Sequence, residues 1–255
     1  MFRVYVADLS DLMNGFREPE KTGFLDRNSK DLPDQRKEKI RRFYRTDDAI
    51  SSLAAYGLLV YALHRETGRD LLPEFRTGPG GKPCLTEPES LLFNLSHCRD
   101  AVACIVGESE AGIDIQEEFS YEESLARQFC SDRELEFLKG SAGEGQEICR
   151  LWTLKEAGAK YMGTGLTTDF REMDFCSGYP PAGGPWFFVG DLGQRKLAVC
   201  VEKDPGFLKA RVLRINPDSR NIRELFLEPE DPRGAMELTP FSGFPEAGKR
   251  VDYTL

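Results

Sequence analysis

The pattern of hydrophobic and polar residues along the chain predicts both helices and strands. Apolar residues that recur on one helix face predict helices, and short runs that are apolar or alternate with polar residues predict strands. The predicted helices cover residues 34–44, 48–66, 134–140 and 145–162. The predicted strands cover residues 2–9, 91–97, 101–107, 111–116, 195–202 and 209–215. Because strands and helices occur in separate groups, this order predicts an α+β fold.

The order of elements also indicates how the chain is divided. We expect two similar α+β halves that meet near residue 108, an N-terminal half over 1–107 and a C-terminal half over 108–205. No internal repeat is strong enough to establish the two halves from the sequence itself. Several prolines interrupt the chain after about residue 205. We therefore expect 206–255 to be an extension of unassigned role, whose last 40 or so residues lie on the surface or are partly disordered.

Length, charge and cysteine content narrow the class of protein. The chain has 255 residues, of which 40% are hydrophobic, so it can bury a full core. Its net charge of −9 argues against binding to nucleic acid or to an anionic membrane, because both would be repelled. No segment has the length and hydrophobicity of a membrane span, and the first residues lack a secretory signal pattern. The seven cysteines are scattered and form no Cys-x-x-Cys pair, so we expect reduced thiols and a cytoplasmic location.

Two helices carry charges that their own pattern does not explain. Residues 34–45 are strongly basic although the protein is acidic, and taken alone they indicate a solvated helix face. In the helix 145–162, Lys155 falls on the apolar stripe that also contains Leu151 and Ala159. A buried ammonium without a partner is costly, so Lys155 must either extend to solvent or meet an anion.

Polar residues at three further places are candidates for chemistry. Asp114 and Gln116 share one face of the strand 111–116, and Asp114 together with Glu156 could supply two carboxylates of the kind that magnesium prefers. An isolated aspartate in a strand is, however, more often an edge or turn residue. His97, which follows Ser96 at the end of a strand, is equally compatible with a packed histidine and with a phosphate ligand. The segment Gly-Gly-Lys-Pro at 80–83 is by default a turn, although its glycines would let a ligand approach the backbone.

Taken in order, these segments resemble one known family. The residues that carry the resemblance are "RKEKIRRFY", "GGKPCL", "FNLSHC", "GIDIQ" and "LWTLKEAGAKYMGTGL". Together they are similar to the Sfp-type 4′-phosphopantetheinyl transferases, over residues 1 to about 205. The resemblance implies a pseudo-twofold pair of α+β halves, with coenzyme A and Mg²⁺ bound in the cleft between them.

The resemblance also implies roles for individual residues. Arg36 and Lys39 would lie near the 3′-phosphate of coenzyme A, and Lys82 and Pro83 would flank its adenosine. The implied coenzyme A-binding residues are Arg36, Lys39, Ser52, Lys82, Pro83, Ser96, His97, Lys155 and Lys160. The implied metal ligands are Asp114, Gln116 and Glu156, and the implied catalytic residues are Glu156, Lys155, His97 and Asp114. Gln116 departs from the family, in which many members carry a second carboxylate at this position, so we expect a raised magnesium requirement.

The implied reaction is attack by a carrier-protein serine on the β-phosphate of coenzyme A, which releases 3′,5′-ADP. Glu156 is the candidate general base. The expected partners are coenzyme A and an acyl or peptidyl carrier protein of fatty-acid, polyketide or peptide synthesis, and we expect a monomer. A non-catalytic coenzyme A-binding protein with the same fold is the first alternative. The second is an interaction module whose basic helix docks an acidic partner.

Overall fold

The computed structural model describes residues 1–88, 90–141, 144–228 and 235–244. Its α-helices are α1 (Ser10–Gly15), α2 (Glu18–Ser29), α3 (Asp34–Arg41), α4 (Thr46–Thr67), α5 (Glu123–Phe129), α6 (Asp132–Gly140) and α7 (Glu144–Met162). Its strands are β1 (Arg3–Asp8), β2 (Phe75–Thr77), β3 (Pro83–Leu85), β4 (Leu92–His97), β5 (Ala101–Gly107), β6 (Ala111–Glu117), β7 (Trp186–Leu192), β8 (Arg195–Val201), β9 (Leu208–Ile215), β10 (Phe226–Leu227) and β11 (Ala235–Pro240). The α+β fold class predicted from the sequence is confirmed.

One curled sheet organises the described part of the chain. Its strands follow the order β4-β5-β1-β9-β11-β7-β8-β6, and β10 pairs with β9. The pair β1–β9 is parallel and the other recorded pairs are antiparallel. The two ends of this order come together, because the backbone N–H of Ile113 in β6 donates to the side-chain oxygen of Asn94 in β4 at 3.1 Å. The sheet therefore curls until its first and last strands lie side by side.

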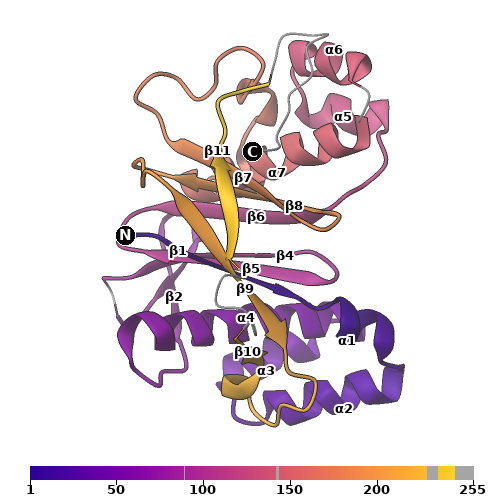
Figure 1. Cartoon of the computed structure of the whole chain (residues 1–255). Coiled ribbons are helices and arrows are strands. Elements are labelled where there is room, and N and C mark those ends of the chain that lie inside the picture. Colours follow the sequence, from indigo (N-terminus) through magenta and orange to yellow (C-terminus); the bar gives the residue numbers. More distant parts are fainter. Residues whose placement is uncertain (89, 142–143, 229–234, 245–255) are drawn as a thin grey trace.

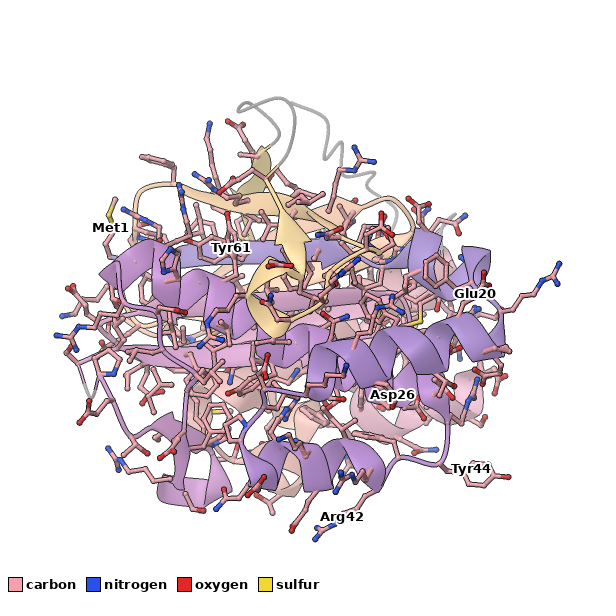
Figure 2. The ribbon with its side chains drawn as sticks, turned by 90° about the horizontal axis from the view of Figure 1, so that it is seen from below. Met1, Glu20, Asp26, Arg42, Tyr44 and Tyr61 are labelled. Carbon is pink, nitrogen blue, oxygen red and sulfur yellow. The ribbon has the colours of Figure 1, made fainter. Side chains whose placement is uncertain are left out.

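Helices cover the two outer faces of this sheet. In Figure 1, α1 to α4 lie below the sheet and α5 to α7 lie above it. Each group covers its own hydrophobic core, and a third core is formed where strand residues from both parts of the sheet face one another. Seen from below, α2, which carries Glu20 and Asp26, lies in front, and the loop after α3 carries Arg42 and the fully exposed Tyr44 at the edge of the molecule (Figure 2). The result is a layered arrangement in which helices enclose the strands.

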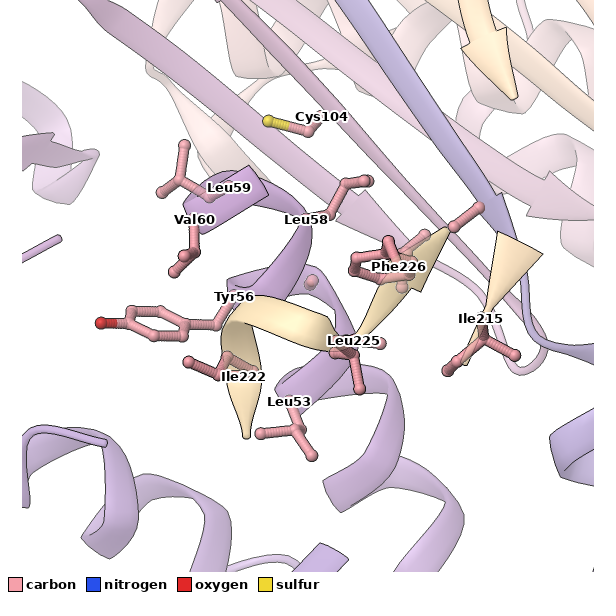
Figure 3. Packing of buried hydrophobic residues seen from close by; sticks show 14 of the residues in the cluster. Leu53, Tyr56, Leu58, Leu59, Val60, Cys104, Ile215, Ile222, Leu225 and Phe226 are labelled. Carbon is pink, nitrogen blue, oxygen red and sulfur yellow. The ribbon is translucent and has the colours of Figure 1, made fainter. Parts of the chain in front are cut away.

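Helix α4 is the centre of the lower core. It is apolar along most of its length and ends at Gly68, whose positive φ of 68° closes the last turn. Figure 3 shows its residues Leu53 and Leu58 among Ile222, Leu225 and other residues from the C-terminal part of the chain. The hydrophobic core covered by α1 to α4 is thus completed by residues more than 150 positions away in the sequence.

The C-terminal segment differs from the prediction. Strand β9 agrees with the strand predicted at 209–215, but β11 also belongs to the main sheet, where it pairs with both β9 and β7. These strands therefore connect the two parts of the sheet and are not a surface extension. The remainder of that predicted extension, 229–234 and 245–255, lies outside the described residues. Within the described ranges, the structure has no helix of the length and hydrophobicity that a membrane span requires.

Candidate active site

A cavity of about 410 Å³ collects most of the residues that the sequence singles out. It lies between α3, α4, the loop that joins β2 to β3, the strand β4 and the end of α7. The predicted residues that line it are Arg36, Lys39, Ser52, Lys82, Pro83, His97 and Lys160. Four cationic side chains and a histidine thus share one cavity in an acidic protein.

The basic helix α3 faces this cavity with two of its cations. The guanidinium of Arg36 donates to the hydroxyl of Ser52 at 3.0 Å and also bonds the Ser52 carbonyl, and it stacks 5.0 Å from the ring centre of Tyr56. Burial lowers the pKa of Arg36 to about 10, so it remains protonated at neutral pH. Burial and the charge of Arg36 both lower the pKa of Lys39. Cations that are partly buried and close together in this way favour an anionic ligand.

His97 is subject to the same field. Burial, followed by the nearby charges of Lys160 and Lys39, lowers its pKa. The imidazole is therefore mainly neutral at pH 7 in the free protein. A bound phosphate would oppose these effects and favour the protonated ring.

Next to the cavity-lining residue Lys160, Asp114 and Ser96 complete a largely buried polar cluster. The Oδ1 atom of Asp114 accepts hydrogen bonds from Lys160 Nζ at 2.6 Å and from Ser96 Oγ at 2.7 Å. Lys160 Nζ also donates to Ser96 Oγ at 2.9 Å. The second oxygen, Oδ2, is buried and has no hydrogen-bond partner within the described part of the chain. A buried carboxylate oxygen of this kind is costly unless a ligand completes it.

The cluster depends on close contact between α7 and β6. A Cβ atom placed on Gly112 would lie 2.0 Å from the carbonyl oxygen of Ala157 and 2.5 Å from the amide nitrogen of Tyr161. Glycine is therefore needed for the helix backbone to rest directly on the strand. This contact brings Lys160 and Glu156 of α7 to Asp114 of β6.

Glu156 and Gln116 complete the predicted metal ligands. Burial and the charge of Asp114 raise the pKa of Glu156, whereas Lys160 partly offsets this shift. Gln116 is half-buried on the same strand face as Asp114, and its amide nitrogen donates to the carbonyl of Glu117 at 3.3 Å. The unpartnered Asp114 oxygen and the neighbouring carboxylate of Glu156 fit a hard divalent cation. A full set of three His, Cys, Asp or Glu ligands is not found among the described residues, so waters or substrate oxygens would have to complete the coordination.

The structure places Lys155 away from this cavity. Its ammonium is fully buried and bonds Glu134 at 2.7 Å and the carbonyls of Phe170 and Met173 at 2.7 and 2.8 Å. Lys155 thus meets an anion, as its apolar position requires, but that anion is a carboxylate of α6. The geometry gives no support to a phosphate-binding or catalytic role for Lys155. The sequence signal that was available is the helix start Ser131-x-x-Glu134, where Glu134 also accepts from the Ser131 backbone.

Two further residues were not identified from the sequence. Asn94 joins β4 to β6, and Glu110 bonds the ammonium of Lys82 at 2.7 Å. Neither has a distinctive local pattern, because each acts on a partner in a distant strand or loop. Only the tertiary structure identifies them.

Comparison with known proteins agrees with this geometry. The family model of the 4′-phosphopantetheinyl transferase superfamily matches residues 110–202, which contain β6 and α7. The 4′-phosphopantetheinyl transferase Sfp of Bacillus subtilis (strain 168) is 31% identical over 136 residues, or 52% of this chain and 61% of that protein. The 4′-phosphopantetheinyl transferase pptA of Paxillus involutus is 32% identical over 163 residues, or 54% and 61%.

These two matches span less than two thirds of the relatives' own length. A 4′-phosphopantetheinyl transferase of Bacillus subtilis is matched more fully, with 30% identity over 152 residues, or 58% of this chain and 68% of that protein. On the sequence motifs, the cavity and these relatives together, the chain belongs to the 4′-phosphopantetheinyl transferase superfamily.

Proposed function

We propose that this protein is a 4′-phosphopantetheinyl transferase. It would move the phosphopantetheine arm of coenzyme A onto a serine of an acyl or peptidyl carrier protein and release 3′,5′-ADP. The observation that carries this proposal is the convergence of Arg36, Lys39, His97 and Lys160 on one cavity, where Lys160 also bonds the carboxylate of Asp114. Such a site suits a ligand with several phosphates and a reaction at one of them.

The cavity suggests how coenzyme A is held. Arg36 and Lys39, with Ser52, would bind the 3′-phosphate, because both cations are partly buried and neither has an ion-pair partner among the described residues. Lys82 and Pro83 would flank the adenosine. Ser96, His97 and Lys160 would bind the pyrophosphate, with hydrogen bonds strengthened by charge.

Asp114, Glu156 and the amide oxygen of Gln116 would hold Mg²⁺, a proposal that rests on the unpartnered Asp114 oxygen. When bound, the ion would neutralise charge on the pyrophosphate. Lys160 would remain beside Asp114 and add a fixed positive charge on the same side.

In the proposed reaction, the serine oxygen of the carrier forms a bond to the β-phosphorus of coenzyme A. The bond between that phosphorus and the oxygen bridging to 3′,5′-ADP breaks, and the electron pair leaves with the nucleotide. Glu156 would accept the serine proton, directly or through a water molecule. Positioning and charge neutralisation, rather than covalent catalysis, would supply the rate enhancement.

The arrangement of the site also supports a two-half description. We propose that residues 1–107 and 108–205 are related by a pseudo-twofold axis, since each contributes helices to one outer face and residues to the cavity. Residues 206–255 would then link the halves through β9 and β11. We further propose that the protein acts as a monomer in the cytoplasm, where its seven unpaired cysteines would stay reduced.

The test is the intact mass of an apo carrier protein after incubation with this protein, coenzyme A and Mg²⁺. We expect a gain of one phosphopantetheine that is lost when EDTA is added. Glu156→Gln should reduce transfer by about 10²-fold or more while it leaves thermal unfolding unchanged. A folded Glu156→Gln variant with the wild-type rate would exclude Glu156 as the base. Coenzyme A binding without transfer to any carrier would instead indicate a non-catalytic binding protein.

A further inference from the structure

The loop between β2 and β3 forms one wall of the cavity but does not belong to the main sheet. Strands β2 and β3 make a separate two-stranded hairpin, whose loop contributes Gly80, Gly81 and Lys82 to the cavity lining, as does Pro83 at the start of β3. The base of the hairpin rests on the lower core, where the ring of Phe75 lies 5.4 Å from that of Phe93 and 6.0 Å from that of Tyr56. The tip extends away from this support.

The tip is attached to the opposite wall at two points. Lys82 Nζ donates to Glu110 Oε2 at 2.7 Å and to the carbonyl of Ala111 at 3.2 Å, both at the start of β6. Beside it, a Cβ atom on Gly80 would lie 2.1 Å from the carbonyl oxygen of Gly163, just after α7. The loop thus crosses from the α4 side of the cavity to the β6–α7 side and touches the backbone there.

The contacts of Lys82 distinguish two possible roles for its ammonium, as a phosphate ligand or as the group that holds the loop in place. Its side chain is 15% exposed, and its charge is already balanced by Glu110, which is 52% exposed. Unlike the Asp114 carboxylate that bonds Lys160, the Glu110 carboxylate is not a proposed metal ligand, and at 2.7 Å it competes with a phosphate for the Lys82 ammonium. A lysine that holds a loop in place needs such a partner.

We propose that Glu110 is a positioning residue, and that the Lys82–Glu110 ion pair is a clasp that holds the 78–83 loop across the coenzyme A cavity. The inference rests on the proposed function and adds to it a residue that does not itself line the cavity. The clasp would fix the width of the cavity at the end that binds the nucleotide before coenzyme A arrives. Less conformational entropy is then lost when coenzyme A binds.

The first test is Glu110→Gln, which removes the charge and keeps the shape. We expect the KM for coenzyme A to rise about three-fold, with about five-fold as the ceiling for a partly exposed ion pair, and kcat to stay unchanged. A lower KM would overturn the clasp, because it would mean that Glu110 restrains a phosphate-binding lysine. The matched control is Glu123→Gln, which removes a carboxylate of similar exposure, 47% against 52%, from its ion pairs with Arg127 and Lys139, outside the cavity lining.

The second test asks whether Lys82 and Glu110 affect the KM for coenzyme A through their mutual ion pair. Lys82→Met should raise KM as much as Glu110→Gln, and the double variant should raise it no further, because both changes remove one interaction. If the double variant raises KM by the product of the two single effects, the two residues act independently and the clasp is wrong.

Calorimetry of the wild-type protein with coenzyme A distinguishes a failure of the proposed function from a failure of the clasp alone. Wild-type protein that neither binds coenzyme A nor modifies a carrier would overturn the proposed function. An active wild type whose Glu110→Gln variant matches the Glu123→Gln control would overturn the clasp alone.

Discussion

The contact between Gly112 and α7 leads to a prediction that the structure makes quantitative. Adding a single methyl group through Gly112→Ala would place its Cβ 2.0 Å from the carbonyl oxygen of Ala157, whereas ordinary contacts begin at 3.4 Å. The obstacle is helix backbone and not the end of a flexible side chain, so no rotamer change can relieve it. Helix α7 must therefore retreat from β6 by about 1.4 Å, the difference between these distances.

This retreat should affect stability and activity to different degrees. Overpacking of a well-packed contact costs about 1–3 kcal/mol in the free energy of unfolding. For a protein of this size that lowers the Tm by roughly 2–12 °C. Activity should suffer more, because α7 carries Glu156 and Lys160 while β6 carries Asp114. A displacement of about 1 Å between reacting groups can cost about 10²-fold in rate, so we expect kcat to fall by that order.

The assay combines thermal unfolding with the rate of carrier-protein modification by mass spectrometry, measured well below the Tm of the variant. The control is Gly15→Ala at the end of α1, where an added Cβ has nothing within 4 Å, so stability and rate should both be retained. A Gly112→Ala variant with the wild-type Tm and rate would refute the claim that this close contact sets the site geometry.

Three further predictions follow from the site. Lys155→Met should lower the free energy of unfolding by about 3–5 kcal/mol in urea titrations, because it leaves Glu134 buried without its cation. Normal stability with weakened coenzyme A binding would instead show that Lys155 is a phosphate ligand. Coenzyme A binding should take up a proton near pH 7 and weaken as pH rises, because the lowered pKa of His97 leaves its ring neutral until phosphate binds. Calorimetry in two buffers of different ionisation enthalpy should detect this proton uptake, and His97→Gln should remove it. Gln116→Glu should lower the Mg²⁺ concentration needed for half-maximal rate, whereas the control Glu117→Gln, on the opposite strand face, should leave it unchanged. A Gln116→Glu variant with an unchanged Mg²⁺ titration would place Gln116 away from the metal.

The amino-acid sequence by itself determined the main elements and, apart from Asn94, the polar and charged side chains of the cavity lining. Helix α4 and strands β1, β4, β5, β6 and β8 follow their apolar patterns closely, because each buries one or both faces in a core. The polar residues Asp114 and His97 were conspicuous because they interrupt such patterns. Helices α1 and α2 were not predicted, since Ser10–Ser29 is too rich in charged residues to show a clear apolar face.

Only the tertiary structure decided which groups meet. Periodicity shows that Lys155 faces the core, but not that Glu134, 21 positions earlier, is the group across from it. In the same way, the bond from Lys160 to Ser96 spans 64 positions, and Glu110 meets Lys82 only because a hairpin tip reaches the far wall of the cavity. Local patterns record whether a side chain is buried, whereas the partner of a buried charge is set by how distant elements pack. That is why the cavity could be anticipated from the sequence, while the ion pairs that support it could not.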